Sequence, residues 1–202
     1  MGTARLAEDL EWAHRSRPLD PREESGDLHV VEIFSGGALL AVIDGLGHGP
    51  EAASAAKRAA ETMKTCADNE PVEVVKRCHA ALRATRGAAL LVLSLSFREA
   101  LVTWAGVGNI EGWHMRPTGR EALLSRAGVV GYQITGPRRQ SASLAPGDLF
   151  VLATDGISAR FSESLTRTGR PEELAEAIFT NYARVTDDAL VLVARYSEEA
   201  GS

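Results

Sequence analysis

Two short apolar segments of this 202-residue chain each run into an aspartate followed by glycine, and this pattern limits the possible folds more than any other feature of the sequence. The segment 39–43 leads directly into Asp44, and the segment 149–153 leads through one threonine into Asp155. A buried strand that ends in this way carries a carboxylate to the end of a sheet, and the glycine allows the chain to turn sharply there. The pattern therefore predicts two acidic side chains at sheet ends.

Further aspartates stand next to other apolar segments. Asp27 completes a Ser-Gly-Asp triplet before the segment 28–34, and Asp187 lies just before the segment 189–196. Hard divalent cations prefer oxygen ligands, so carboxylates brought to one sheet edge from distant parts of a chain favour a magnesium or manganese site. A single Asp-Gly dipeptide commonly marks only a turn. The combination of these aspartates favours the metal site over that simpler alternative.

The composition favours a single enzyme-sized domain over residues 1–202. The chain is 45% hydrophobic, no repeat or Pro/Gly/Ser linker divides it, and a chain of this length buries about 70% of its unfolded surface. The net charge is −5 and the arginines are scattered, so no basic stripe is available for a phosphate backbone. We therefore expect no nucleic-acid partner.

Features that would direct the chain to a membrane are absent from the sequence. The apolar runs at 38–43 and 88–93 fall far short of the roughly 20 residues of a membrane span, and the N-terminus is too acidic for a signal peptide. Cys66 and Cys78 form no C-x-x-C motif and are expected to be buried free thiols in a reducing compartment. These observations predict a cytoplasmic protein with no membrane partner.

The spacing of apolar residues predicts a mixture of strands and helices. Segments 28–34 and 38–43 are joined by Ser-Gly-Gly and should pair as an antiparallel hairpin. Residues 51–66 should form a long helix, and a second helix should begin at Pro71 and lie beside it on the sheet. Such elements indicate an α+β fold of two packed sheets covered by helices. The other predicted strands are 88–97, 101–107, 112–115, 140–144, 149–153 and 189–196, and the last predicted helix is 172–183.

Five short motifs occur in the order of a known family and span nearly the whole chain. The chain resembles the metal-dependent protein phosphatases of the PPM superfamily, which are phosphatase 2C-like, and within it the bacterial SpoIIE-like branch. Arg-Gly-Ala at 86–88, and a length that leaves no room for a sensor domain, are most similar to the RsbX-type stressosome phosphatases. The motifs are Ser-Gly-Asp at 25–27, Asp-Gly-Leu-Gly-His-Gly at 44–49, Gly-Val-Gly-Asn at 106–109, Thr-Asp-Gly at 154–156 and Asp-Asp at 187–188.

The resemblance implies both a fold and an activity. The implied fold is a four-layer α-β-β-α sandwich of two antiparallel sheets flanked by helices. The implied activity is hydrolysis of phosphoserine and phosphothreonine by a water that two divalent cations, Mn²⁺ or Mg²⁺, activate. The implied partners are phosphorylated STAS-domain proteins of stress signalling, similar to the stressosome components RsbR and RsbS.

The resemblance also assigns roles to individual residues. It implies that Asp44 bridges both metals and that the carbonyl of Gly45 binds one of them. Asp155 and Asp187 would hold the other metal, and Asp27 would serve the second metal directly or through water. In the pair 187–188, alignment with the family assigns the role of metal ligand to the first aspartate, Asp187. The second, Asp188, is then a supporting or surface residue.

Two further residues are candidates for catalysis, and each has a plain structural alternative. His48 stands four residues after Asp44, where an imidazole near a bound phosphate can protonate the leaving serine oxygen; the alternative is a helix entry or an exposed loop. Arg22 stands five residues before Asp27, where a guanidinium can bind a substrate phosphate; the alternative is a solvated loop. The polar segment 161–170 is a candidate for the substrate-facing surface.

The remaining histidines and one asparagine are interpreted as structural. His14, His29, His79 and His114 show no spacing typical of metal ligands. Asn109 lies beside glycine, as in ordinary turns, and is expected to organise its loop rather than contact substrate.

Other classes of function are compatible with parts of this pattern. The loop 44–49 lies between a strand and a helix, as nucleotide-binding loops do, but it lacks the G-x-G-x-x-G spacing and no G-K-[ST] follows. A catalytically weak or dead phosphatase fold that acts as a protein-binding module would be expected to have lost metal carboxylates, and all of them are present here. A different two-metal hydrolase would use the same carboxylates.

Overall fold

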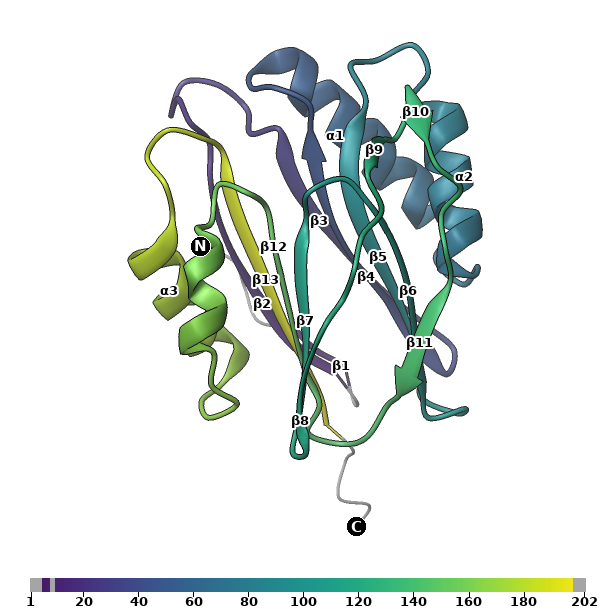
Figure 1. The fold of residues 1–202 in the computed structure, drawn as a ribbon, viewed down its shortest axis with the longest axis vertical. Helices are drawn as coiled ribbons and strands as arrows, with labels where there is room; N and C mark the ends of the chain where they lie inside the picture. Colours follow the sequence, from purple (N-terminus) through teal and green to yellow (C-terminus); the bar gives the residue numbers. More distant parts are fainter. Residues whose placement is uncertain (1–4, 8–9, 198–202) are drawn as a thin grey trace.

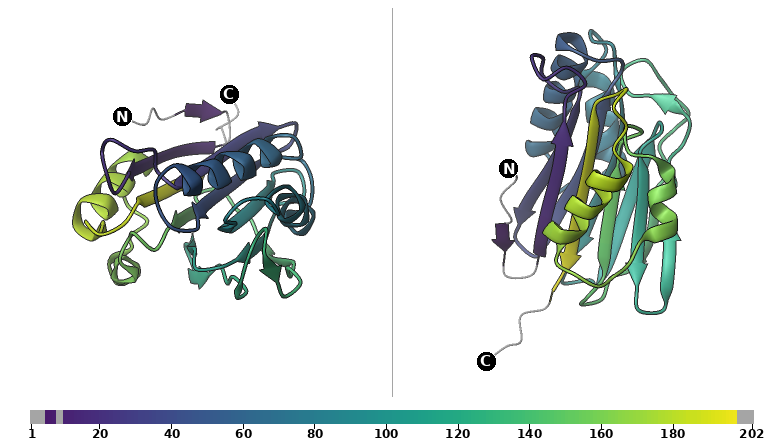
Figure 2. Two further views of the ribbon diagram at one scale, coloured as in Figure 1. Left: turned by 90° about the horizontal axis from the view of Figure 1, so that it is seen from above. Right: turned by 90° about the vertical axis from the view of Figure 1, so that its left-hand side faces the viewer.

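Two antiparallel sheets stack face to face, with helices on their outer faces (Figure 1). This computed structural model describes residues 5–7 and 10–197, so the ends of the predicted 1–202 domain, and part of the N-terminal segment used to argue against a signal peptide, lie outside the described residues. The five-stranded sheet has the order β11-β6-β5-β4-β3, and the six-stranded sheet has the order β1-β2-β13-β12-β7-β8. Figure 2 shows the same layers from above and from the side. The predicted four-layer arrangement is confirmed.

The elements follow one another along the chain with short connections. The helices are α1 (Pro50–Lys64), α2 (Pro71–Ala81) and α3 (Pro171–Tyr182), with a short 3-10 helix η1 (Ala159–Ser164). The strands are β1 (Arg5–Ala7), β2 (Leu10–Arg17), β3 (Asp27–Phe34), β4 (Gly37–Gly45), β5 (Ala88–Ser96), β6 (Leu101–Val107), β7 (Glu111–Arg116), β8 (Gly119–Ala122), β9 (Gly128–Val129), β10 (Gln133–Ile134), β11 (Gln140–Ser143), β12 (Leu149–Ala153) and β13 (Ala189–Tyr196).

The central strands are buried on both faces, which explains their continuous apolar sequences. Strand β4 sends Leu40 and Val42 into the core between the sheets, where they share a cluster with Leu152 of the opposite sheet. The alternate residues Leu39 and Ala41 pack on the other side, beneath α1 and α2. A strand enclosed in this way loses the apolar-polar alternation of a half-exposed strand. Each large apolar side chain buried here contributes about 1.5–3 kcal/mol.

Helix α1 lies unusually close to the end of β4. Its buried face consists mostly of alanines, so the helix can approach the sheet closely. A Cβ added at Gly45 would lie 2.2 Å from the carbonyl oxygen of Ala52, a distance that no real side chain tolerates. Gly45 is therefore required for this packing, and the packing fixes the position of the chain immediately after Asp44.

Most predicted elements are confirmed, with shifts of at most two residues at their ends. The hairpin of β3 and β4 pairs as expected, and α2 lies beside α1 on the five-stranded sheet. The predicted end of the strand before Asp44 was wrong, because β4 continues through Asp44 and Gly45. Asp44 is thus held by strand pairing on both sides, since it lies opposite Asp27 in β3 and Ala89 in β5.

Cys66 and Cys78 are both buried and free, as predicted. The segment 161–170 does not form a uniformly exposed surface: Phe161 is fully buried beneath the six-stranded sheet, because it anchors η1 in the core that also contains α3. Among the helices of residues 5–7 and 10–197, none is long and apolar enough to cross a bilayer.

Candidate metal centre

Asp27 and Asp44 face each other across adjacent strands at one end of the five-stranded sheet. They are direct partners in the register of β3 and β4. Asp27 is only 4% exposed, and Asp44 is partly buried. The hydroxyl of Thr154, which directly follows β12 of the six-stranded sheet, donates a hydrogen bond of 2.7 Å to Oδ2 of Asp27. This contact ties the two sheets together at the end where the aspartates lie.

Asp155 and Asp187 reach the same place from the six-stranded sheet. Asp155 follows β12 and Asp187 precedes β13, and because these strands are antiparallel neighbours their two ends lie side by side. Figure 1 shows the ends of β4 and β12 and the starts of β3 and β13 gathered at the top of the molecule. Asn109, in the loop after β6, donates a 2.7 Å hydrogen bond to Oδ2 of Asp155. The prediction that Asn109 organises this loop agrees with the contact.

The electrostatics show that these carboxylates share one region. Burial raises the pKa of Asp27 to about 8, with a further increase from the charge of Asp44. Burial raises the pKa of Asp44 to about 7, with further increases from Asp155 and Asp187. Burial and Asp155 also raise the pKa of Asp187. Like charges in a partly dry environment disfavour ionisation, and a bound cation reverses that preference.

The donor chemistry fits a hard divalent cation, because the ligands available are carboxylate and backbone oxygens. Within the described residues, no three His, Cys, Asp or Glu side chains are arranged tightly enough to hold an ion as they stand. The mutual pKa effects nevertheless place the carboxylates within strong electrostatic reach of one another. Like charges repel, so a cation between these carboxylates would favour a closer arrangement of them.

Asp188 has a different role from its neighbour Asp187. Its Oδ1 accepts a hydrogen bond from the backbone N–H of Leu19, and its Oδ2 accepts one from the N–H of Gly26, both at 2.6 Å. Asp188 is 4% exposed, so it is not a surface residue as one alternative had it. Because both of its oxygens are engaged by the backbone of the segment that leads into β3, Asp188 positions Asp27. This leaves Asp187 as the candidate ligand.

Close backbone contacts explain the glycines of this region. A Cβ at Gly156 would lie 1.8 Å from the carbonyl oxygen of Asp188, so the turn after Asp155 can pass the start of β13 only without a side chain. The N–H of Gly45 donates to the carbonyl of Gly26 at 3.0 Å, which links the residues next to Asp44 and Asp27. The Asp-Gly pattern thus reflects packing of the two sheet ends as well as turn formation.

The two predicted catalytic side chains outside the carboxylates differ in position. His48 is exposed, and its charge lowers the pKa of Asp187, so it lies at the border of the acidic cluster. The guanidinium of Arg22 is 88% exposed and pairs with Asp20 at 2.6 Å. Among the described contacts, none joins Arg22 to the clustered aspartates, so its role in phosphate binding stays a prediction.

The other histidines have structural contacts, as expected. The rings of His14 and His29 are tilted against each other, with their centroids 3.9 Å apart. His114 is buried against Asp148, with Nε2 and Oδ2 separated by 2.9 Å. Nδ1 of His79 accepts the backbone N–H of Gly131 at 3.0 Å.

Two residues near the site did not stand out in the sequence. Thr154 was seen only as part of a motif, although its hydroxyl contacts Asp27 and also accepts the N–H of Leu190. Arg86 forms an ion pair with Glu51 at the start of α1 and approaches the loop at Gly47. The triplet at 86–88 was the available signal for Arg86, but no sequence pattern predicts which loop it contacts.

The fold and the acidic end of the paired sheets define a domain of the phosphatase 2C type. Residues 35–197 match the family model described as Stage II sporulation protein E (SpoIIE). The chain therefore belongs to the SpoIIE family.

Individual relatives agree with this assignment. Phosphoserine phosphatase RsbX of Bacillus subtilis (strain 168) is 23% identical over 174 residues, which are 85% of this chain and 87% of that protein. A crystal structure of RsbX in complex with magnesium matches with a TM-score of 0.89 and 21% identity, over 98% of this chain and 100% of the other. A chain of the structure described as "The bacterial stressosome: a modular system that has been adapted to control secondary messenger signaling" matches with a TM-score of 0.85 and 34% identity, over 93% of this chain and 100% of that one.

The raised pKa values predict how the stability of the metal-free protein depends on pH. Asp27 and Asp44 bind protons more tightly in the folded chain than in the unfolded chain, so their contribution to stability is complete below about pH 4 and is lost as the pH rises through about 7 and 8. We expect the melting temperature in chelator to fall between pH 6 and pH 9, and added Mn²⁺ to restore it. Asp44→Asn should flatten this pH dependence; an unchanged slope in that variant would contradict the cluster.

Asp187 and Asp188 provide a matched pair of variants. Asp188→Asn should lower the free energy of unfolding by about 1–3 kcal/mol, because one of two buried N–H donors loses its acceptor. Asp187→Asn should leave the free energy of unfolding nearly unchanged but weaken binding of Mn²⁺. Urea unfolding and Mn²⁺ titration of both variants separate these effects, and the opposite pattern would exchange the two roles.

Proposed function

We propose that this protein is a metal-dependent protein serine/threonine phosphatase. The observation that carries the proposal is the gathering of acidic side chains from both sheets, in which Asp27, Asp44 and Asp187 all have raised pKa values. The magnesium complex of RsbX supports a divalent cation as cofactor, and two Mn²⁺ or Mg²⁺ ions suit an all-oxygen site. When bound, they would supply an activated water and neutralise charge on the phosphoryl group.

Asp44 is the proposed ligand shared by both cations. Its pKa responds to Asp155 and Asp187 of the six-stranded sheet, and it raises the pKa of Asp27 in its own sheet. Asp44 is also the direct register partner of Asp27. The carbonyl of Gly45 and the carboxylate of Asp27 would complete one side, and Asp155 and Asp187 the other.

Neighbouring polar groups hold these ligands before any cation arrives. Thr154 engages one oxygen of Asp27, and Asn109 engages one oxygen of Asp155, so the second oxygen of each carboxylate is available. Such supporting hydrogen bonds fix the orientation of ligands and reduce the reorganisation that binding requires. His48, at the border of the cluster, is the proposed acid for the leaving oxygen, and Arg22 is the proposed contact for the substrate phosphate.

The proposed substrates are phosphorylated STAS-domain proteins of stress signalling, of the RsbR and RsbS type. The RsbX relative is named a phosphoserine phosphatase, and the 34% identical chain comes from work on the bacterial stressosome; both support this choice. A cytoplasmic location is part of the proposal and is supported by two buried free thiols, which suit a reducing compartment. All of the proposed metal carboxylates are present, so the site gives no support to the alternative of an inactive regulatory module.

Removal of one proposed ligand tests the activity. Asp155→Ala should lower manganese-dependent phosphate release from a serine-phosphorylated STAS-domain protein by about a hundredfold or more, because ligand loss weakens both binding and positioning. The assay compares Mn²⁺, Mg²⁺ and chelator, and far-UV circular dichroism checks the fold. The matched control is Asp68→Ala, an exposed aspartate in the connection between α1 and α2. Equal activity of Asp155→Ala and wild type would refute the site.

The role of His48 is tested by comparing leaving groups. If His48 protonates the serine oxygen, His48→Ala should slow hydrolysis of a phosphoserine peptide far more than hydrolysis of an aryl phosphate, because a phenolate leaves without a proton. Values of kcat for both substrates, measured at one Mn²⁺ concentration, decide the question. Equal slowing of the two reactions would exclude this role.

A further inference from the structure

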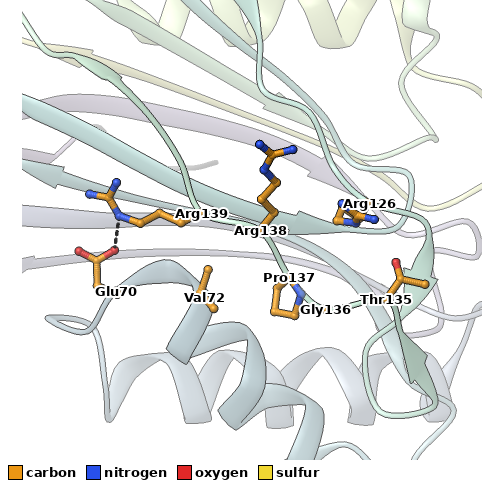
Figure 3. Close-up of a pocket in the computed structure, with 8 residues that line it drawn as sticks. All are labelled: Glu70, Val72, Arg126, Thr135, Gly136, Pro137, Arg138 and Arg139. Atoms are coloured by element: carbon orange, nitrogen blue, oxygen red, sulfur yellow. Dashed lines mark hydrogen bonds and ion pairs between the residues drawn. The ribbon is translucent and has the colours of Figure 1, made fainter.

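A groove on the outer side of the five-stranded sheet carries a concentration of positive charge that the proposed chemistry does not use. It lies between the start of α2 and the loop that joins β10 to β11, and its volume is about 610 Å³. Figure 3 shows three arginine side chains around it. Residues that define the groove are Glu70, Val72, Arg126, Pro137, Arg138 and Arg139.

The charge of this groove opposes that of the whole chain. The protein has a net charge of −5, whereas the groove has three arginines and one glutamate. Nε of Arg139 donates to Oε2 of Glu70 at 3.0 Å, so this pair is neutral. Arg126 and Arg138 are exposed and, within the part of the chain that the structure describes, neither forms an ion pair. Two guanidinium groups therefore remain for an external partner, and a guanidinium binds a carboxylate through two parallel hydrogen bonds.

The groove is connected to the proposed metal centre by the backbone. The N–H of Arg126 donates to the carbonyl of Gly106, and the carbonyl of Arg126 accepts the N–H of Gly108, both at 2.9 Å. The next residue in that loop is Asn109, which donates to Asp155. One wall of the groove is thus bonded, through the backbone of Arg126, to the loop that holds one of the proposed ligands.

The walls of the groove are held in place by further contacts. The N–H of Gly131 is bonded to His79 of α2, and the hydroxyl of Thr135 donates to the carbonyl of Ala127 at 3.2 Å. These contacts fix the loop against α2 before a ligand binds, which reduces the entropy lost on binding. Val72 and Pro137 add an apolar surface between the arginines. A peptide segment with acidic side chains fits both properties.

We propose that the groove formed by Arg126 and Arg138 binds an acidic segment of the phosphoprotein substrate and thereby selects which phosphoserine reaches the metal centre. This inference rests on the proposed phosphatase function. The occupant is a segment of the substrate itself, because the backbone of Arg126 is bonded to the loop that carries Asn109 and the unpaired charge of the groove is opposite to that of carboxylates. A nucleic acid would need a longer basic stripe than two unpaired arginines on an acidic protein.

The test uses two phosphoserine peptides that differ only in flanking charge. One peptide has four acidic residues on one side of the phosphoserine, and its partner peptide has glutamines at the same positions. Each peptide is made in two versions, with these four residues either before or after the phosphoserine. We expect wild type to hydrolyse one acidic version with a kcat/KM about tenfold higher than its glutamine counterpart, mainly through KM, and this preference should fade in high salt. In Arg126→Glu/Arg138→Glu the preference should disappear, while turnover of an aryl phosphate stays unchanged.

The matched control is Arg58→Glu/Arg98→Glu, which has the same total charge but alters exposed arginines on α1 and in the β5–β6 turn. The control should keep the peptide preference. Loss of the preference in both double variants would overturn the proposed docking role of the groove, because the total charge of the protein would then be sufficient to explain the preference. Equal kcat/KM of wild type for both peptides, or an undiminished preference in the groove variant, would also overturn it.

A binding measurement separates failure of this inference from failure of the phosphatase proposal. If wild type hydrolyses neither peptide nor the aryl phosphate, the proposed function fails, and fluorescence anisotropy of the labelled acidic peptide then decides the groove alone. Weaker binding in the groove variant, with normal binding in the control, would support the docking surface. Equal peptide binding by wild type, groove variant and control would contradict it. A groove variant that loses binding of a single-stranded oligonucleotide but keeps binding of the peptide would also contradict it.

Discussion

The structure depends on the burial of mutually repelling carboxylates where two sheets meet. Asp27 and Asp44 lie opposite each other in adjacent strands, and burial together with their charges raises both pKa values to about 8 and 7. An arrangement that opposes its own ionisation lowers the stability of the free protein near neutral pH, and a cation that neutralises the cluster removes this penalty. The unfavourable electrostatics of the free chain and the proposed affinity for divalent cations are therefore two consequences of one geometry.

Hydrogen bonds and close backbone packing hold this region in place around the charges. Asp188 accepts two backbone N–H groups and so positions the start of β3, while Thr154 joins the two sheets through Asp27. Glycines at positions 45 and 156 allow backbone approaches that no side chain would permit. Because the contacts of Asp188 and Thr154 join segments far apart in the sequence, the centre can form only when both sheets have folded. The groove at Arg126 extends the same framework, since the loop that supports Asp155 also supports one of its walls.

Sequence reasoning was most successful where burial leaves a periodic signal. Strands β4, β5, β12 and β13 are enclosed on both faces and were predicted from their apolar runs, and the aspartates at the ends of β4, β12 and β13 followed directly. Strand β2 was missed because its polar and partly buried residues, such as His14 and Arg15, show no clear alternation. The contacts of Asp188 with Leu19, of Thr154 with Asp27 and of Glu70 with Arg139 span 69 to 169 residues of sequence, and no local pattern predicts them. The choice of Asp187 as ligand was made by resemblance, and the buried contacts of Asp188 supply a physical reason for it.

The central claim is that aspartates from both sheets form one two-cation centre, and anomalous diffraction from crystals grown with Mn²⁺ tests it most directly. The account predicts two manganese peaks roughly 3.5–4 Å apart between the sheets, with Asp44 in contact with both, Asp27 on one side, and Asp155 and Asp187 on the other. Side-chain rotation, without movement of β4 or β12, should bring the ligands together. Manganese bound elsewhere on the surface, or an ordered crystal in Mn²⁺ with no peak between these aspartates, would contradict the account.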